Sequence, residues 1–170
     1  MVSRAPVGPF VRYPHPALAT PAVPRAVDDA MREIGRRLLE GAVAAHAYGL
    51  AAAHIGEPAP VIVLNVTPEA AASYELFYNP VVLEQASDLE AGREASVSLP
   101  GVEVEIARPV WAEIGFDTEE GKPAQRRFEG FLARCALHEL EQMNGRFFLA
   151  NLSRLKREMA LKKAAKRHLG

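Results

Sequence analysis

One histidine–glutamate pair in the sequence has the residue types and the helical setting of a hydrolase site. His138 and Glu139 are followed by Gln142, inside a segment predicted to be a helix from about Phe131 to Met143. Residues four positions apart share a helix face, so His138 and Gln142 point the same way. In H-E-x-x-H hydrolases two imidazoles at this spacing bind zinc, and the glutamate handles the proton of a metal-bound water. Here an amide replaces the second imidazole, so the pair alone indicates either a degenerate metal site or an ordinary buried histidine.

Three ordered segments are more specific than this pair. They are Ala47-Tyr-Gly-Leu-Ala-Ala-Ala-His-Ile-Gly56, Glu94-Ala-Ser-Val-Ser-Leu-Pro-Gly101 and His138-Glu-Leu-Glu-Gln-Met-Asn-Gly145. With comparable gaps, they resemble the peptide deformylase motifs G-x-G-L-A-A-x-Q-x-G, E-G-C-L-S-x-P-G and H-E-x-D-H-L-x-G. The resemblance implies an α+β, peptide-deformylase-like fold. In that fold, antiparallel or mixed sheets pack around a central helix that carries the third motif, and further helices lie near the N-terminus and at the C-terminus.

The resemblance also implies which positions would hold a metal. Members of the family bind a divalent ion (iron, zinc or nickel) through a cysteine and two histidines, whose positions here are Ser96, His138 and Gln142. A neutral hydroxyl and an amide oxygen bind such ions far more weakly than a thiolate and an imidazole. We therefore expect weak metal binding or none. We also expect loss of the family activity, the metal-dependent removal of the formyl group from N-formylmethionine peptides.

The family's catalytic positions correspond to Glu139, His54 and Val97. Glu139 matches the general acid/base, whereas His54 replaces the glutamine that hydrogen-bonds the reacting oxygen. Two interpretations of His54 stay open. In one, His54 and His138 rebuild a metal site with Glu139 or Ser96, and the chain is an active metal-dependent amide hydrolase. In the other, His54 fills a disused pocket and bonds Glu139 or Ser96, because two histidines and one misplaced carboxylate rarely satisfy a metal's geometry.

The substrate pocket that the resemblance implies is altered as well. Its positions hold Tyr48, Gly49, Glu94, Phe131, Arg134 and Cys135. An arginine in a thioether pocket is costly to desolvate unless it meets an anion, so Arg134 either turns to solvent or faces a negatively charged ligand. A narrowed, collapsed pocket is the third alternative. We expect Cys135 to be inert packing, and Glu94 to pair with Arg108 and brace the sheet.

The elements that must position these residues follow from periodicity. Apolar residues at helical spacing predict a helix from Val27 to about Ala47 that stops at Gly49, and another helix is predicted at about Ser153 to Arg167. Six prolines within residues 3–25 predict an extended arm without a helix. β-Branched or alternating runs predict strands at residues 61–66, 76–83, 102–106, 110–116 and 125–128.

Length and composition bound the remaining possibilities. The 170 residues, 49% of them hydrophobic, suit a single domain over residues 1–170, with an extended arm at 1–25 and a basic helix at 152–170. A net charge of −1 and the lack of a long apolar stretch predict neither a membrane partner nor specific DNA binding, and one cysteine suits the cytoplasm. The expected partners are a peptide N-terminus or, by resemblance to bacterial deformylases, the ribosome at the basic helix. A solvated terminal helix and a scaffold role that uses the surface alone stay open.

Overall fold

The structure, a computed structural model, describes residues 10–168. Three α-helices, seven strands and three short 3-10 helices lie in this range. In chain order they are η1 (Pro16–Ala19), α1 (Asp29–Ala45), β1 (Gly49–Ala51), η2 (Ala52–Ile55), β2 (Val61–Asn65), β3 (Tyr74–Gln85), β4 (Leu89–Ser96), β5 (Leu99–Pro109), β6 (Trp111–Asp117), β7 (Pro123–Glu129), α2 (Gly130–Met143), η3 (Phe148–Asn151) and α3 (Arg154–His168).

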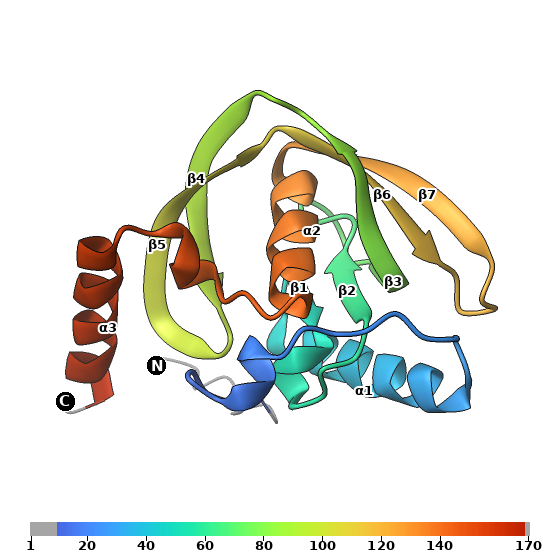
Figure 1. The fold of residues 1–170 in the computed structure, drawn as a ribbon, viewed down its shortest axis with the longest axis horizontal. Coiled ribbons are helices and arrows are strands. Elements are labelled where there is room, and N and C mark those ends of the chain that lie inside the picture. Colours follow the sequence, from blue (N-terminus) through green and yellow to red (C-terminus); the bar gives the residue numbers. More distant parts are fainter. Residues whose placement is uncertain (1–9, 169–170) are drawn as a thin grey trace.

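Helix α2 stands at the centre of the molecule, between two antiparallel sheets (Figure 1). One sheet has five strands in the order β1-β2-β3-β6-β7, and the other is a ribbon of β4 and β5. The apolar side of α2 packs on the five-stranded sheet, where Leu137 and Leu140 join Phe77 and Ile114 in one buried cluster. This arrangement confirms the predicted α+β fold with a central helix that carries the third motif.

Helix α1 begins where the sequence supplies a cap. The Asp28 carboxylate accepts a hydrogen bond of 2.9 Å from the backbone N–H of Met31. Met31 and Leu38 are fully buried against β2 and β3. The helix ends one turn before the predicted stop, because His46 adopts a left-handed conformation with φ 50°. Gly49 does not end the helix; it begins β1.

The proline-rich arm contains one short helix that the sequence did not predict. Pro16 occupies the first turn of η1, where its missing N–H costs nothing. Otherwise the arm is extended and lies along the molecule (Figure 1). It donates backbone hydrogen bonds of 2.9 Å from Val11 to the His54 carbonyl and from Ala22 to the Met143 carbonyl. Residues 1–9 of the predicted arm lie outside the described residues.

The β4–β5 ribbon completes the wall on the other side of α2. Its strands pair from Leu89 opposite Pro109 to Ser96 opposite Leu99. Helix α3 packs against β5 through Ala160 and Ala164, and it lies at the edge of the molecule. No helix in residues 10–168 is long and apolar enough to cross a membrane.

Candidate functional site

A cavity of about 330 Å³ lies among β1, η2, the end of β4 and α2. It gathers segments that are widely separated in the sequence. Gln142 is the one predicted site position that does not line it. The other eleven do, and they are His54, Val97, Glu139, Ser96, His138, Tyr48, Gly49, Glu94, Phe131, Arg134 and Cys135.

Glu139 lies at the inner wall of this cavity and is only 5% exposed. Its Oε2 atom is 3.5 Å from Nε2 of His54, and its Oε1 atom is 3.9 Å from Nε2 of His138. Oε2 is buried without a hydrogen-bond partner among the described residues. Gly49 permits this approach of α2 to β1, because an added Cβ would lie 3.1 Å from Cγ of Glu139 and 2.9 Å from Cδ2 of Leu64.

His138 is held by a carboxylate on its far side. Its Nδ1 atom lies 2.6 Å from Oε1 of Glu94, which fixes the ring so that Nε2 faces Glu139. Burial opposes the charged imidazole, but the hydrogen bond to Glu94 and the negative charge of Glu139 outweigh it and raise the pKa of His138. His138 therefore lies between two carboxylates, hydrogen-bonded to Glu94 and 3.9 Å from Glu139.

Glu94 is the hub of the buried ion network. Arg108 donates to both of its oxygens, at 2.9 and 2.8 Å, and also contacts Glu141 at 2.9 Å. Burial favours the neutral acid, but the hydrogen bonds from Arg108 and His138 outweigh it and lower the pKa of Glu94 to about 2. The predicted pairing of Glu94 with Arg108 is confirmed, and it joins β4 to β5, while the contact of Arg108 with Glu141 ties the ribbon to α2.

Two of the three positions expected to hold a metal are engaged elsewhere. The amide nitrogen of Gln142 donates a hydrogen bond of 2.8 Å to the Leu18 carbonyl, so this side chain ties α2 to the arm. The Ser96 hydroxyl accepts a hydrogen bond of 3.1 Å from the backbone N–H of Ser98. In the described part of the chain, no cluster of three or more His, Cys, Asp or Glu residues is arranged to bind a metal. This donor set does not fit the family's divalent ion.

His54 has a different partner from the one expected. Its Nδ1 atom lies 2.9 Å from Oγ of Ser98, not of Ser96, and both residues are 1% exposed. Its distance to Glu139 exceeds that of a good hydrogen bond. Ser98 belongs to the second motif, two positions after Ser96, and it lies in the two-residue turn that joins β4 to β5. The turn, and not the spacing along a strand, brings Ser98 to His54.

Arg134 does not turn to solvent, and its anionic partner is Glu94 of the same chain, not a ligand. Its guanidinium contacts Oε2 of Glu94 at 2.8 Å and the carbonyls of Ile106 and Glu90 at 2.7 and 2.5 Å. The side chain thus spans from α2 to the ribbon, and it lines the cavity. It passes over Gly92, where an added Cβ would lie 2.7 Å from its Cζ and Nε atoms. No local pattern marks Gly92, because its role depends on a contact with Arg134, 42 residues away.

The outer part of the cavity is apolar and partly open. Tyr48 and Phe131 meet edge to face with ring centroids 4.9 Å apart, and they are 56% and 44% exposed. Burial, together with the nearby carboxylates of Glu139 and Glu94, raises the pKa of Cys135 to about 12, so its thiol is neutral at physiological pH. Val97 faces the same cavity, and its carbonyl accepts a hydrogen bond of 3.1 Å from Arg12 of the arm.

Known proteins share this architecture over nearly the whole chain. The profile of the family described as "Polypeptide deformylase" matches residues 7–158. A "Peptide deformylase-like" protein of Rhizobium meliloti (strain 1021) is 38% identical over 162 residues, which is 94% of this chain and 92% of that protein. A "Peptide deformylase" of the same strain is 32% identical over 94% of this chain and 93% of that protein.

Solved structures agree with these sequence relationships. The peptide deformylase of Synechococcus elongatus, crystallised with actinonin, has a TM-score of 0.85 and 30% identity, covering 96% of this chain and 90% of that chain. The peptide deformylase of Ehrlichia chaffeensis has a TM-score of 0.86 and 26% identity, covering 94% and 95%. The motifs, the fold and these comparisons show that the chain belongs to the peptide deformylase family.

Proposed function

We propose that this chain is a binding protein for peptide N-termini that has kept the deformylase cavity without the metal-dependent removal of formyl groups. The observation that carries the proposal is the use of Gln142 and Ser96 in internal hydrogen bonds, while His138 and Glu139 still face the cavity. A cavity that is apolar at its mouth and polar at its inner wall suits a ligand with an apolar body and a polar end.

The rebuilt metal site with His54, His138 and Glu139 has less support. Nε2 of His54 lies 3.5 Å from Oε2 of Glu139, and Nε2 of His138 lies 3.9 Å from Oε1 of the same carboxylate. Among residues 10–168, no group of three or more His, Cys, Asp or Glu side chains has the arrangement of a metal site. A metal needs donors that converge from separate directions on one point, with a further group to complete a tetrahedron.

Metal content and turnover test the loss of metal chemistry. We expect untagged protein purified without oxygen to contain far less than stoichiometric iron, nickel or zinc, and to release no formate from formyl-Met-Ala-Ser. The variant Ser96→Cys with Gln142→His should take up metal. A matched control, Ser87→Cys with Gln125→His, makes the same substitutions at exposed positions outside the cavity and should not take up metal.

Two results together contradict the loss of metal chemistry. One is stoichiometric metal in the native protein that disappears in His138→Ala, and the other is turnover that Glu139→Gln abolishes.

A comparison of linear and cyclic peptides tests the binding of a chain end. A linear tetrapeptide such as Ala-Ala-Ser-Ala should bind in isothermal titration calorimetry, whereas the head-to-tail cyclised peptide of the same composition should not. Equal affinity for both would show that the cavity does not recognise an end. The proposal implies a cytoplasmic location, because new peptide ends emerge there.

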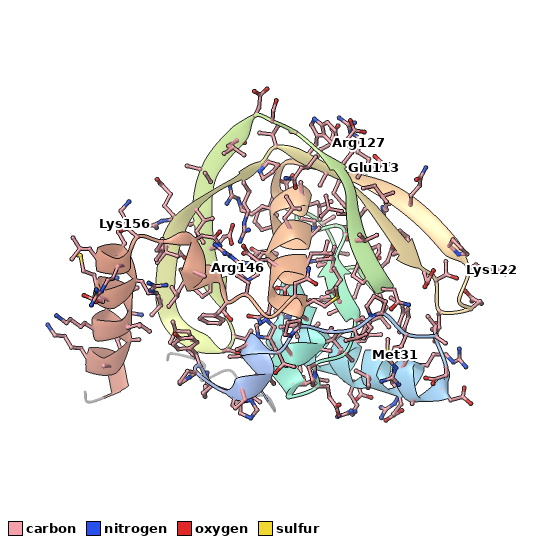
Figure 2. All side chains as sticks on the ribbon, viewed as in Figure 1. Met31, Glu113, Lys122, Arg127, Arg146 and Lys156 are labelled. Atoms are coloured by element: carbon pink, nitrogen blue, oxygen red, sulfur yellow. The ribbon has the colours of Figure 1, made fainter. Side chains whose placement is uncertain are left out.

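The ribosome is a second candidate partner, favoured by the surface of α3. The helix buries Ala160 and Ala164 and leaves most of its cations exposed, and Lys156 lies at the edge of the molecule in Figure 2. RNA attracts such a surface electrostatically. Lys162→Glu with Lys163→Glu should weaken salt-sensitive cosedimentation with ribosomes, whereas Arg126→Glu on β7 should not. Equal cosedimentation of both variants contradicts this partner.

A further inference from the structure

The inner wall of the cavity presents an incomplete hydrogen-bonding site. Oε2 of Glu139 belongs to a residue that is 95% buried, and it accepts no hydrogen bond from the described residues. A buried carboxylate oxygen without a donor costs free energy unless a ligand or water supplies one. The missing partner is therefore a donor that enters from the cavity.

The neighbouring imidazole identifies the kind of donor. Nδ1 of His54 lies 2.9 Å from Oγ of Ser98, and its Nε2 lies 3.5 Å from Oε2 of Glu139. In the tautomer whose Nδ1 donates to Ser98, Nε2 presents a lone pair to the cavity beside that oxygen. Two acceptors at this separation can both reach one nitrogen at about 2.8–2.9 Å, provided that the nitrogen has at least two N–H groups.

We infer, building on the proposed function, that the cavity recognises the free α-ammonium group of a peptide whose first residue is short. An ammonium group has three N–H donors and a positive charge opposite to that of Glu139. A formylated end has a single N–H and adds a carbonyl oxygen, which the carboxylate repels. The ligand class is therefore the unblocked peptide, not the formyl peptide.

Arg134 sets the size of the first side chain. Its guanidinium is bonded to Glu94 and to carbonyls of both ribbon strands, so it forms a fixed wall between α2 and the ribbon. Moving it aside breaks charge-assisted hydrogen bonds that are individually among the stronger kinds. Alanine, serine or glycine at the first position fits beside this wall better than a long side chain.

Calorimetry with four synthetic peptide amides tests the inference. They are Ala-Ala-Ser, formyl-Ala-Ala-Ser, Met-Ala-Ser and formyl-Met-Ala-Ser. The unblocked alanine peptide should bind roughly tenfold or more tightly than its formyl form, since a charge-assisted hydrogen bond is at stake. It should also bind more tightly than the methionine peptide. Glu139→Gln should remove the preference for the free amine, whereas Glu84→Gln, at an exposed position on β3, should preserve it.

The outcomes separate this inference from the proposed function. If the formyl peptides bind as tightly as the free amines or more tightly, the ammonium preference is wrong while end recognition stands. If the methionine peptide binds better than the alanine peptide, the role of Arg134 is wrong. If none of the four peptides binds, both the inference and the proposed function are wrong. Circular dichroism of Glu139→Gln confirms that lost discrimination does not come from unfolding.

Discussion

Nδ1 of His138 lies 2.6 Å from Oε1 of Glu94, so the central helix and the β4–β5 ribbon are joined by a buried, charged hydrogen bond. Arg108 and Arg134 add three further contacts to the same carboxylate. The Glu94 carboxylate therefore supports both the cavity wall and the packing of the ribbon on α2. Its protonation weakens its hydrogen bonds to His138, Arg108 and Arg134 together.

This link predicts acid sensitivity. The folded pKa of Glu94 is about 2, below the ordinary value of 4.5, so its stabilising contribution is present above pH 4.5 and is lost as the pH falls towards 2. The contribution at neutral pH is on the order of 3 kcal/mol. Urea unfolding between pH 2 and 7 should show a steeper loss of stability below pH 4.5 in the native protein than in Glu94→Gln. Parallel curves would contradict the role of Glu94, and Glu84→Gln serves as the surface control.

Gly92 and Arg134 are predicted to be coupled. Gly92→Ala places a methyl group 2.7 Å from the Arg134 guanidinium, which its hydrogen bonds hold in place, and this should cost about 1–3 kcal/mol of unfolding free energy. In an Arg134→Ala background the same change should cost little. Urea unfolding of the two single variants and the double variant gives the coupling energy. Additive costs would show that Arg134 can move aside freely.

Gln142 is predicted to stabilise the folded protein by bonding α2 to the proline-rich arm. Gln142→Met keeps the length of the side chain but removes the donor to the Leu18 carbonyl, and an unpaired buried carbonyl costs about 1–3 kcal/mol. Gln125→Met, at an exposed position of β7, should change the stability little. Thermal or urea unfolding measures both. A Gln142→Met protein as stable as the control variant would mean that water replaces this hydrogen bond.

Cys135 is predicted to resist alkylation. With a pKa of about 12, its thiolate fraction at pH 8 is roughly a thousandfold below that of a free thiol. Iodoacetamide should therefore label the native protein far more slowly than the urea-unfolded protein, as followed by mass spectrometry. Glu139→Gln removes one of the charges that raise this pKa and should speed the labelling. Equal labelling rates in native and unfolded protein would show that the thiol is not held neutral by the fold.

Much of the fold follows from local sequence patterns. The period of apolar residues predicted α1, α2 and α3, and β-branched or alternating runs predicted β2, β3, β5, β6 and β7. Strands β1 and β4 were missed, because Gly49–Ala51 is very short and the polar run Leu89–Ser96 has no alternation. Each exists through pairing with a neighbouring strand. Strand formation there depends on a partner, which a local pattern does not contain.

The sequence by itself determined the family and the positions at which this chain departs from it. Three ordered motifs align each metal and catalytic position of the family with one residue of this chain. Only the tertiary structure decided what the replacements do. Gln142 bonds a carbonyl 124 residues away, and His54 meets Ser98 across 44 residues. A polar side chain takes whichever buried partner the folded backbone brings within about 3 Å, and sequence distance carries no information about that choice.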